Sequence, residues 1–463
     1  MSGLTTDLSV SVASLLASTQ AMDVTTTNIA NMNTPGYARR KVILEESTPT
    51  GNDEATTGVD VKAIRSLRDN VLELRINSAM SQQNLSSTVY NSLSAVELSF
   101  SDTASGSIGS TLDNFFSSLQ ALSVTPANTS LRSNVLTAAS NLASAFRGTA
   151  AVISDSQHQL DRSVVQSTSD INSLLQQIAI ANSAITSAQK LGQSSNSAED
   201  QRSALLSQLS GTIDFRTVNS DDGLMLTTAN GTALVVGSKA YSLTNSLNAS
   251  GLNNVYSGGV DITGTIQGGS LGGYIQSRDQ TLASMATQLD QFAFQFAQAV
   301  NNVQSSGSDI NGTLGVALFN PPDTTAGSAA GAASSMKVAL SGPSQIAAAA
   351  LGGASGDNSN LAKLIDLQNQ AIVNGSTPTT AYSDMTFSIG NTISQANTNA
   401  TASENILLQL QNQQGSISGV SLDEESANLL LYQRSFQAAA KIITTIDTLM
   451  GNLLDMGVNN PGY

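Results

Sequence analysis

The sequence predicts a mainly α-helical fold with a small β-rich insertion in its middle. Apolar residues recur at helical spacing before residue 212 and after residue 266, short alternating runs occupy 212–266, and a sevenfold apolar repeat stands near each end. Sevenfold repeats are typical of helices that pair through a buried seam. We therefore expect a terminal α-helical coiled coil, a bundle of long helices built from the N- and C-terminal halves, and a middle domain rich in β-hairpins.

The first element is a helix over about residues 4–31. Its apolar line recurs at every seventh residue and consists of Leu8, Leu15, Met22 and Ile29. Small polar residues hold the alternate seam positions, namely Ser11, Ser18 and Thr25. Thr34-Pro35-Gly36 ends the helix, because the residue before proline avoids the helical region and Pro-Gly fits the central pair of a type II turn.

Two short strands, 42–44 and 59–61, are expected next. Helical periodicity then predicts helices over 64–99, 112–122, 130–191 (either continuous or broken) and 199–209. In 212–266, short alternating runs are separated by Asp222-Gly223, Asn230-Gly231 and Gly258-Gly259, which are typical hairpin turns. Helices return over 271–303 and 360–414, on either side of a Gly/Ala/Ser/Pro-rich stretch at 305–357, and Gly415 and Gly419 close the second of them.

The last helix, about 422–455, begins at a capping box made by Ser421 and Glu424, with acidic residues at its positive end. Its seam again recurs every seven residues and consists of Leu422, Leu429, Phe436, Ile443 and Met450. At 1.5 Å per residue the last helix spans about 50 Å and the first about 40 Å, so the two are similar in length. We expect them to pair.

Three nested domains follow from this order. Residues 1–45 and 416–463 supply the paired terminal helices, 46–211 and 267–415 form a helical-bundle domain with short strands, and 212–266 form a β-rich outer insertion.

Composition excludes several functions. The formal charge of −15 argues against a nucleic acid or an anionic membrane as partner, since both require basic patches. The absence of cysteine excludes disulfides and cysteine chemistry. A cleavable signal peptide has a basic region before an apolar core, whereas the first basic residue here is Arg39. No run of the sequence approaches the roughly 18 apolar residues that a membrane span requires.

Candidate catalytic and metal sites fail on inspection. His158, the only histidine, stands among polar residues and is expected on the surface. Asp309-Ile-Asn-Gly312 resembles a calcium loop, but its twelfth position is Asn320 rather than glutamate. Gly268–Gly273 lacks the strand and helix context of a nucleotide loop. The acidic residues Asp423–Glu425 could be paired catalytic carboxylates, but their place at a helix N-terminus explains them. We expect no catalysis, no cofactor and no metal.

One string carries a family resemblance. Its assigned members are Asn28, Ile29, Asn31, Asn33, Thr34, Pro35, Gly36 and Tyr37. With Gly3-Leu4 and Arg39, this string resembles the N-terminal signature of the bacterial flagellar rod, hook and hook-associated proteins. The stretches 418–429 and 268–279, and the helical region 108–146, resemble the hook-associated branch at the junction of hook and filament. The string is interpreted as an assembly and export motif. Its three asparagines also suit a helix end that passes into a turn, and we expect both interpretations to apply.

The resemblance implies a structural subunit that forms a ring with copies of itself. Its implied partners are the hook protein, the second hook–filament junction protein and a cytoplasmic export chaperone that binds the C-terminal helix. The paired terminal helices would line the central channel. The subunit would be made in the cytoplasm, leave through the flagellar type III apparatus without a cleavable signal peptide, and end outside the cell.

Two alternatives stay open. A hook or rod protein is disfavoured, because hook proteins are β-rich beyond their terminal helices whereas 64–200 here is helical. A secreted enzyme carried on a flagellar scaffold is disfavoured, because 212–266 contains no His, Glu or Cys that could hold a metal.

Overall fold

A computed structural model describes residues 2–47, 58–97, 100, 106–220, 223–320 and 329–458. The chain divides into two compact units. Unit 1 comprises 1–81, 170–242 and 404–463, and unit 2 comprises 82–169 and 243–403. Both are mainly helical with small antiparallel sheets, so the predicted fold class is confirmed.

Three long helices contribute to both units, and they are α2 (Asn70–Glu97), α4 (Thr129–Lys190) and α10 (Pro378–Ser418). Unit 1 adds the helices α1 (Ser2–Ala30), α5 (Asn196–Thr212) and α11 (Leu422–Val458). Its strands are β1 (Arg40–Glu46), β2 (Val59–Ser66), β3 (Arg216–Ser220), β4 (Gly223–Thr227), β5 (Ala233–Val236) and β6 (Lys239–Ala240).

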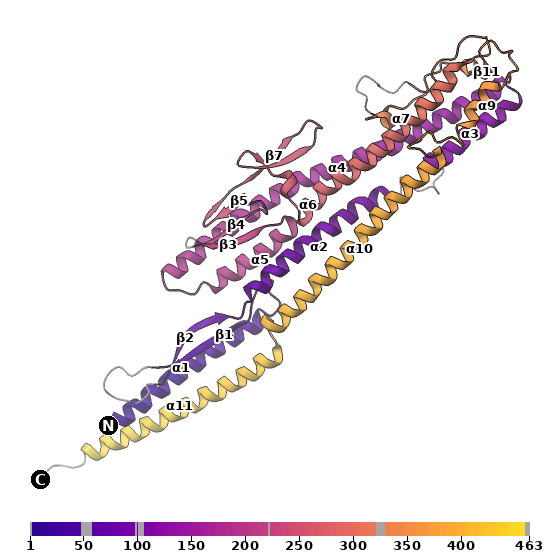
Figure 1. The fold of residues 1–463 in the computed structure, drawn as a ribbon. Helices are drawn as coiled ribbons and strands as arrows, with labels where there is room; N and C mark the ends of the chain where they lie inside the picture. Colours follow the sequence, from indigo (N-terminus) through magenta and orange to yellow (C-terminus); the bar gives the residue numbers. More distant parts are fainter. Residues whose placement is uncertain are drawn as a thin grey trace. The chain divides into compact units, whose positions relative to one another are not determined.

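The terminal helices α1 and α11 pack side by side and antiparallel in unit 1 (Figure 1). Two hydrogen bonds fix their register: Ser18 Oγ donates to Ser435 Oγ at 3.1 Å, and Asn28 Nδ2 donates to Glu425 Oε2 at 2.9 Å. A second face of α1 is covered by the β1–β2 hairpin, which pairs Arg40 with Ser66 and carries a bulge after Ile43. The pairing of the two termini expected from the heptads is therefore present.

The strand-rich middle predicted at 212–266 contains two sheets, one in each unit. Strands β3 to β6 form a four-stranded antiparallel meander in unit 1. A three-stranded antiparallel sheet in unit 2 contains β7 (Leu243–Leu247), β8 (Asn253–Ser257) and β9 (Val260–Asp261). The predicted turns at Asn230-Gly231 and Gly258-Gly259 are confirmed. All four glycines of the three predicted pairs have positive φ, and they are Gly223, Gly231, Gly258 and Gly259. Asp222 lies outside the described residues.

Unit 2 also contains a helical core. Its elements are α3 (Ile108–Val124), α6 (Gly269–Gln276), α7 (Leu282–Ser306), α8 (Ala332–Ser335), α9 (Ser359–Asp366), the π-helical turn η3 (Ser277–Thr281), the 3₁₀ turns η2 (Thr263–Thr265) and η5 (Pro343–Gln345), and the strand pair β10 (Gly307–Ser308) and β11 (Ala349–Ala350). Edge-to-face aromatic pairs fill the centre, for example Phe146 with Phe292 at 5.3 Å between centroids. Such pairs add about 0.5–1.5 kcal/mol each beyond their buried area.

The described parts of the Gly/Ala/Ser-rich stretch, up to residue 320 and from residue 329, pack on α7 through buried amides. The side chain of Gln304 donates to the carbonyl of Gln345 and accepts from the N–H of Ala347. One turn earlier, Asn301 makes the same two-way contact with the backbone of Phe319. These amides satisfy backbone groups of the stretch, and its apolar side chains, among them Leu318, Phe319 and Ile346, join the buried core of unit 2.

A buried ion cluster joins the second sheet to the helices of unit 2. Arg278, in η3, is fully buried and donates to Asp161 of α4 at 2.6 Å and to Asp279 at 2.7 Å. Asp161 also accepts the backbone N–H and the side-chain amide of Asn253, both at 2.7 Å. The guanidinium thus holds the start of β8 against α4.

Two helix predictions were wrong at their boundaries. The helix predicted from residue 64 begins at Asn70, because 59–66 pair with β1 and Asp69 caps the helix by accepting the N–H of Val71 at 2.9 Å. The helix predicted over 360–414 is interrupted after Asp366 and resumes at Pro378, with Asn374 and Gly375 at positive φ between them. Gly415 lies inside α10, so only Gly419 follows its end. The long 130–191 helix is continuous, as α4.

No helix among the described residues is long and apolar enough to cross a membrane.

Candidate functional site

The chain leaves α1 through a type II turn over 34–37. The N–H of Tyr37 donates to the carbonyl of Thr34 at 3.1 Å, Pro35 is the first central residue, and Gly36 follows with φ +80°. A Cβ on Gly36 would lie 2.8 Å from Cβ of Ala204 and 2.9 Å from the carbonyl of Asp200. Glycine is therefore required both by the backbone angle and by the close contact with α5.

Asn28 is the centre of the site and is only 1% exposed. Its Nδ2 donates to the carbonyl of Arg40 and to Oε2 of Glu425, both at 2.9 Å. Its Oδ1 accepts the N–H of Arg40 at 3.0 Å and the hydroxyl of Tyr37 at 2.6 Å. One carboxamide thus uses all of its hydrogen-bonding capacity to connect α1, the turn, β1 and α11.

Arg39 connects the same point to the first turn of α11. Its Nε donates to Glu425 at 2.7 Å and its NH1 to Glu424 at 2.6 Å. Glu425 is 2% exposed, whereas the Glu424 side chain is 61% exposed. The N–H of Arg39 also donates to the carbonyl of Ser418, where α10 ends. A cavity of about 460 Å³ lies between α1, β1 and α11 beside these contacts.

A second ion cluster holds the turn against α5 and α2. Asp200 accepts from Arg40 and from Arg68, each at 2.6 Å. Arg68 also donates to Glu73 at 2.6 Å and to the carbonyl of Gly36 at 2.7 Å. The Arg40 guanidinium lies over the ring of Tyr37, 5.1 Å from its centroid. These largely buried charges compensate one another. Their contacts attach the turn to Asp200 of α5 and to Arg68, which precedes α2.

The phenol of Tyr37 responds to this environment. Burial raises the pKa of the Tyr37 hydroxyl above its ordinary value of 10.0, and the carboxylates of Asp200 and Glu425 act in the same direction. The Arg40 guanidinium acts in the opposite direction. The neutral phenol is the form that donates to Asn28.

The other residues of the string have simpler surroundings. Asn31 donates to the carbonyl of Thr27 and accepts from the hydroxyl of Thr34, which closes the last turn of α1. Ile29 is half-buried, and Asn33, Thr34 and Pro35 are exposed. The structure thus brings Asn28, Gly36 and Tyr37 together and leaves Asn33 and Pro35 at the surface.

The heptad residues lie along the helix pair with unequal burial. On α1 the small polar residues Ser11, Ser18 and Thr25 are buried, while Leu8, Leu15 and Met22 are half-buried. Small residues allow a close approach of the helices, and the larger ones flank the contact. On α11 the half-buried line is Leu429, Phe436, Ile443 and Met450. Leu422 is 50% exposed and lies outside the buried seam.

Several residues of the site were not predicted from the sequence, among them Glu425, Asp200 and Arg68. Glu425 was interpreted only as a charge at a helix N-terminus, although it stands in the alternate heptad line with Tyr432, Ala439 and Ile446. An acidic residue in a seam position is a signal that it meets a buried partner. No local pattern marks Asp200, because it meets Arg40 and Arg68 only in the folded unit.

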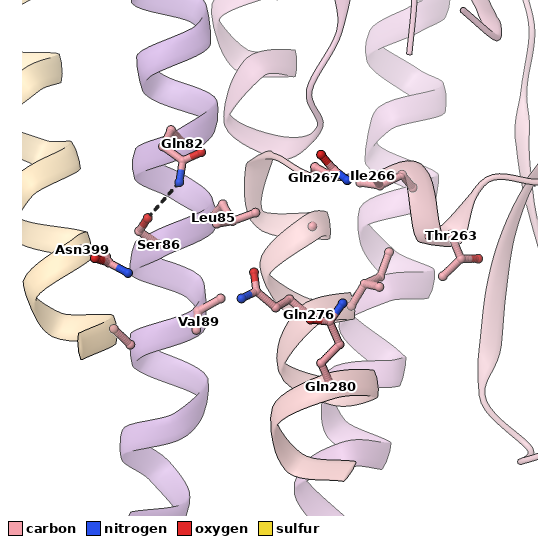
Figure 2. A pocket seen from close by; sticks show the side chains of 14 residues that line it. Gln82, Leu85, Ser86, Val89, Thr263, Ile266, Gln267, Gln276, Gln280 and Asn399 are labelled. Carbon is pink, nitrogen blue, oxygen red and sulfur yellow. Dashed lines mark hydrogen bonds between the residues drawn. The ribbon is translucent and has the colours of Figure 1, made fainter. Parts of the chain in front are cut away.

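A separate cavity of about 450 Å³ lies within unit 2, between α2, α6, α10 and the segment before α6 (Figure 2). Its polar lining consists of amides and hydroxyls, including Gln82, which donates to Ser86 at 3.4 Å, Gln276 and Asn399. None of its lining residues is charged, so it offers no group for acid–base chemistry. Among the described residues, no three His, Cys, Asp or Glu side chains gather into a metal site. His158 is exposed, as predicted.

Three family models match the chain. The flagellar hook-associated protein FlgK helical domain matches residues 93–319, the flagellar basal body rod FlgEFG protein C-terminal model matches 413–456, and the flagella basal body rod protein model matches 8–37. The last two contain the helices that meet at Asn28 and Glu425.

Whole-length relatives agree with these models. The chain is 29% identical to flagellar hook-associated protein 1 of Bacillus subtilis, over 96% of this chain and 97% of that protein. It is 26% identical to the protein of the same name from Salmonella typhimurium, over 96% and 98%. The solved structure of the flagellar hook junction protein FlgK from Burkholderia pseudomallei has the same fold, with a TM-score of 0.67 and 19% identity over 74% of this chain and 100% of that one. The predicted resemblance to flagellar hook-associated protein 1 is therefore confirmed along the whole length of the chain.

Proposed function

We propose that this chain is a structural subunit of the bacterial flagellum that forms the junction between hook and filament. The observation that carries the proposal is the similarity to hook-associated protein 1 relatives along the whole chain, including both terminal helices. The geometry supports it, because α1 and α11 meet in one interlocked pair rather than forming separate tails.

The assembled subunit, in this proposal, has three layers. The helices within 1–45 and 416–463 form the inner, channel-lining layer, 46–211 and 267–415 the bundle, and 212–266 the outer part. The exposed apolar side chains on the terminal helices favour further contacts in an assembly, and they include Val12, Leu16, Leu431, Ile442 and Leu449.

The proposed partners are copies of this chain in a ring, the hook protein on one side and the second junction protein on the other. A cytoplasmic chaperone holds the C-terminal helix before export through the flagellar type III apparatus, which needs no cleavable signal peptide. The subunit acts outside the cell and is not an enzyme. The uncharged lining of the unit 2 cavity supports a structural role.

Electron microscopy of cells that lack this chain tests the proposal. We expect hooks of normal form without filaments, and filament subunits released into the medium. Cells without hooks would instead indicate a rod or hook protein, and normal filaments would contradict any junction role. Hydrolysis of cell-wall or protein substrates by the purified chain would support the enzyme alternative.

A further inference from the structure

The seam between α1 and α11 is too regular to select one register by apolar contacts alone. On α1 the described residues that are buried before Asn28 are all of modest size, and they are Ser11, Ala17, Ser18, Ala21, Val24 and Thr25. On α11 half-buried apolar side chains recur every seven residues. A displacement by one heptad, about 10 Å, brings an equivalent line into contact. The connection at 419–421 has three residues and reaches about 10 Å when extended, so it restricts α11 without choosing among registers.

Glu425 breaks this regularity. It is the buried charge of α11, since the other charged residues of that helix are exposed wherever their side chains are described. Both carboxylate oxygens are used: Oε1 accepts from Arg39 at 2.7 Å, and Oε2 accepts from Asn28 at 2.9 Å. A shift of one heptad would place Tyr432 opposite Asn28 and leave this carboxylate without its partners. A parallel arrangement would separate it from them entirely.

We propose that Glu425 is the specificity-determining residue of the terminal helix pair. Its carboxylate fits the socket formed by Asn28 and Arg39, and thereby selects the antiparallel, in-register pairing over displaced alternatives. A single buried polar residue can specify register in this way even when it adds little net stability. The register of the helix pair is a property of the single subunit, so this proposal does not rest on the proposed function. Only its importance for ring assembly would rest on that function.

Disulfide trapping in the full chain tests the proposal, because the chain has no cysteine of its own. Ser18→Cys with Ser435→Cys reports the observed register, since the two hydroxyl oxygens lie 3.1 Å apart. Ser18→Cys with Ile442→Cys reports a displacement of one heptad. Each pair is oxidised in the purified chain, and intramolecular disulfides are quantified by non-reducing electrophoresis and mass spectrometry.

The expected result is a ratio of displaced to native disulfide that rises at least tenfold when Glu425→Ala is added. Glu425→Gln, which keeps the shape and part of the hydrogen bonding, should give an intermediate ratio. Glu424→Ala is the matched control, because Glu424 also pairs with Arg39 but is exposed, and it should leave the ratio unchanged.

Three outcomes would overturn the proposal. They are an unchanged ratio in Glu425→Ala, an equal rise in Glu424→Ala, and the loss of both disulfides, which would make Glu425 necessary for pairing rather than for its register. None of them depends on where the subunit sits in the flagellum, so this result is independent of the electron microscopy that tests the proposed function.

Discussion

The carboxamide of Asn28 donates a hydrogen bond to the carboxylate of Glu425 at 2.9 Å, although 397 residues separate them in the chain. This contact joins the two terminal helices at the point where α1 passes into the turn and α11 begins. The same carboxamide binds the backbone of Arg40 and the hydroxyl of Tyr37, so the end of one helix, a turn and the start of the other are held as one piece.

Asn28→Ala should weaken the terminal pair. The substitution leaves the Arg40 backbone and one oxygen of Glu425 without a partner in a buried place, which costs about 1–3 kcal/mol. Hydrogen exchange in α1 measures the free energy of local opening. Asn33→Ala is the control within the same string, because Asn33 is exposed, and it should change this value by less than about 0.5 kcal/mol. Equal effects of the two changes would contradict the central place of Asn28.

Gly36→Ala should lower the free energy of unfolding of unit 1 by more than the cost of a left-handed backbone angle alone. Its Cβ would meet Ala204 and Asp200, so the turn must move away from α5. Gly192→Ala is the matched control, since Gly192 has φ +66° but no atom within 4 Å of an added Cβ, and it should cost about 1 kcal/mol. Thermal unfolding of both variants measures the difference, and equal values would show that the contact with α5 is unimportant.

The hydroxyl of Tyr37 should make the stability of unit 1 sensitive to alkaline pH. Its folded pKa lies above the unfolded value of 10.0, so its contribution is fully present below pH 10 and is lost as pH rises through the folded pKa. Tyr37→Phe lacks this titration. The difference in melting temperature between the natural chain and Tyr37→Phe should therefore shrink as the pH rises above 10, and a constant difference would contradict the assignment.

Leu429→Asp and Phe436→Asp should impair both chaperone binding and ring formation. Both side chains are half-buried in the seam against α1, and a charge there opposes helix pairing as well as any apolar contact with a chaperone. Gln437→Asp is the control on the same helix, because Gln437 is polar and exposed in the subunit. Pull-down with the chaperone and electron microscopy of assembled rings measure the two effects. Intact binding and rings in the seam variants would refute this prediction.

Asp161→Asn should loosen the second sheet in unit 2. It removes one partner of the fully buried Arg278, and breaking a buried pair in this way costs about 3–5 kcal/mol. The exposed pair of Lys62 and Glu45 supplies the control, since Lys62→Met should cost at most about 1 kcal/mol. Hydrogen exchange in β8 should increase only in Asp161→Asn.

Local signals allowed much of the fold to be predicted from the sequence. The Thr34–Tyr37 turn was predictable because Pro35 and Gly36 restrict the backbone, and the pairing of the ends was predictable because heptads require a partner. The break between α9 and α10 was missed although Asn374-Gly375 and Pro378 are turn signals and no apolar residue stands at 374–380. The ion clusters at Asp200 and Arg278 were missed because their partners lie far apart in sequence and meet only through tertiary packing.

Locating the subunit in isolated flagella is the direct test of the proposed role at the junction of hook and filament. An epitope inserted in the exposed turn at 192–194, in a functional complementing copy, can be labelled with gold on isolated flagella. We expect one narrow band of label at the boundary between hook and filament. Label along the length of the hook, or confined to the rod, would contradict it.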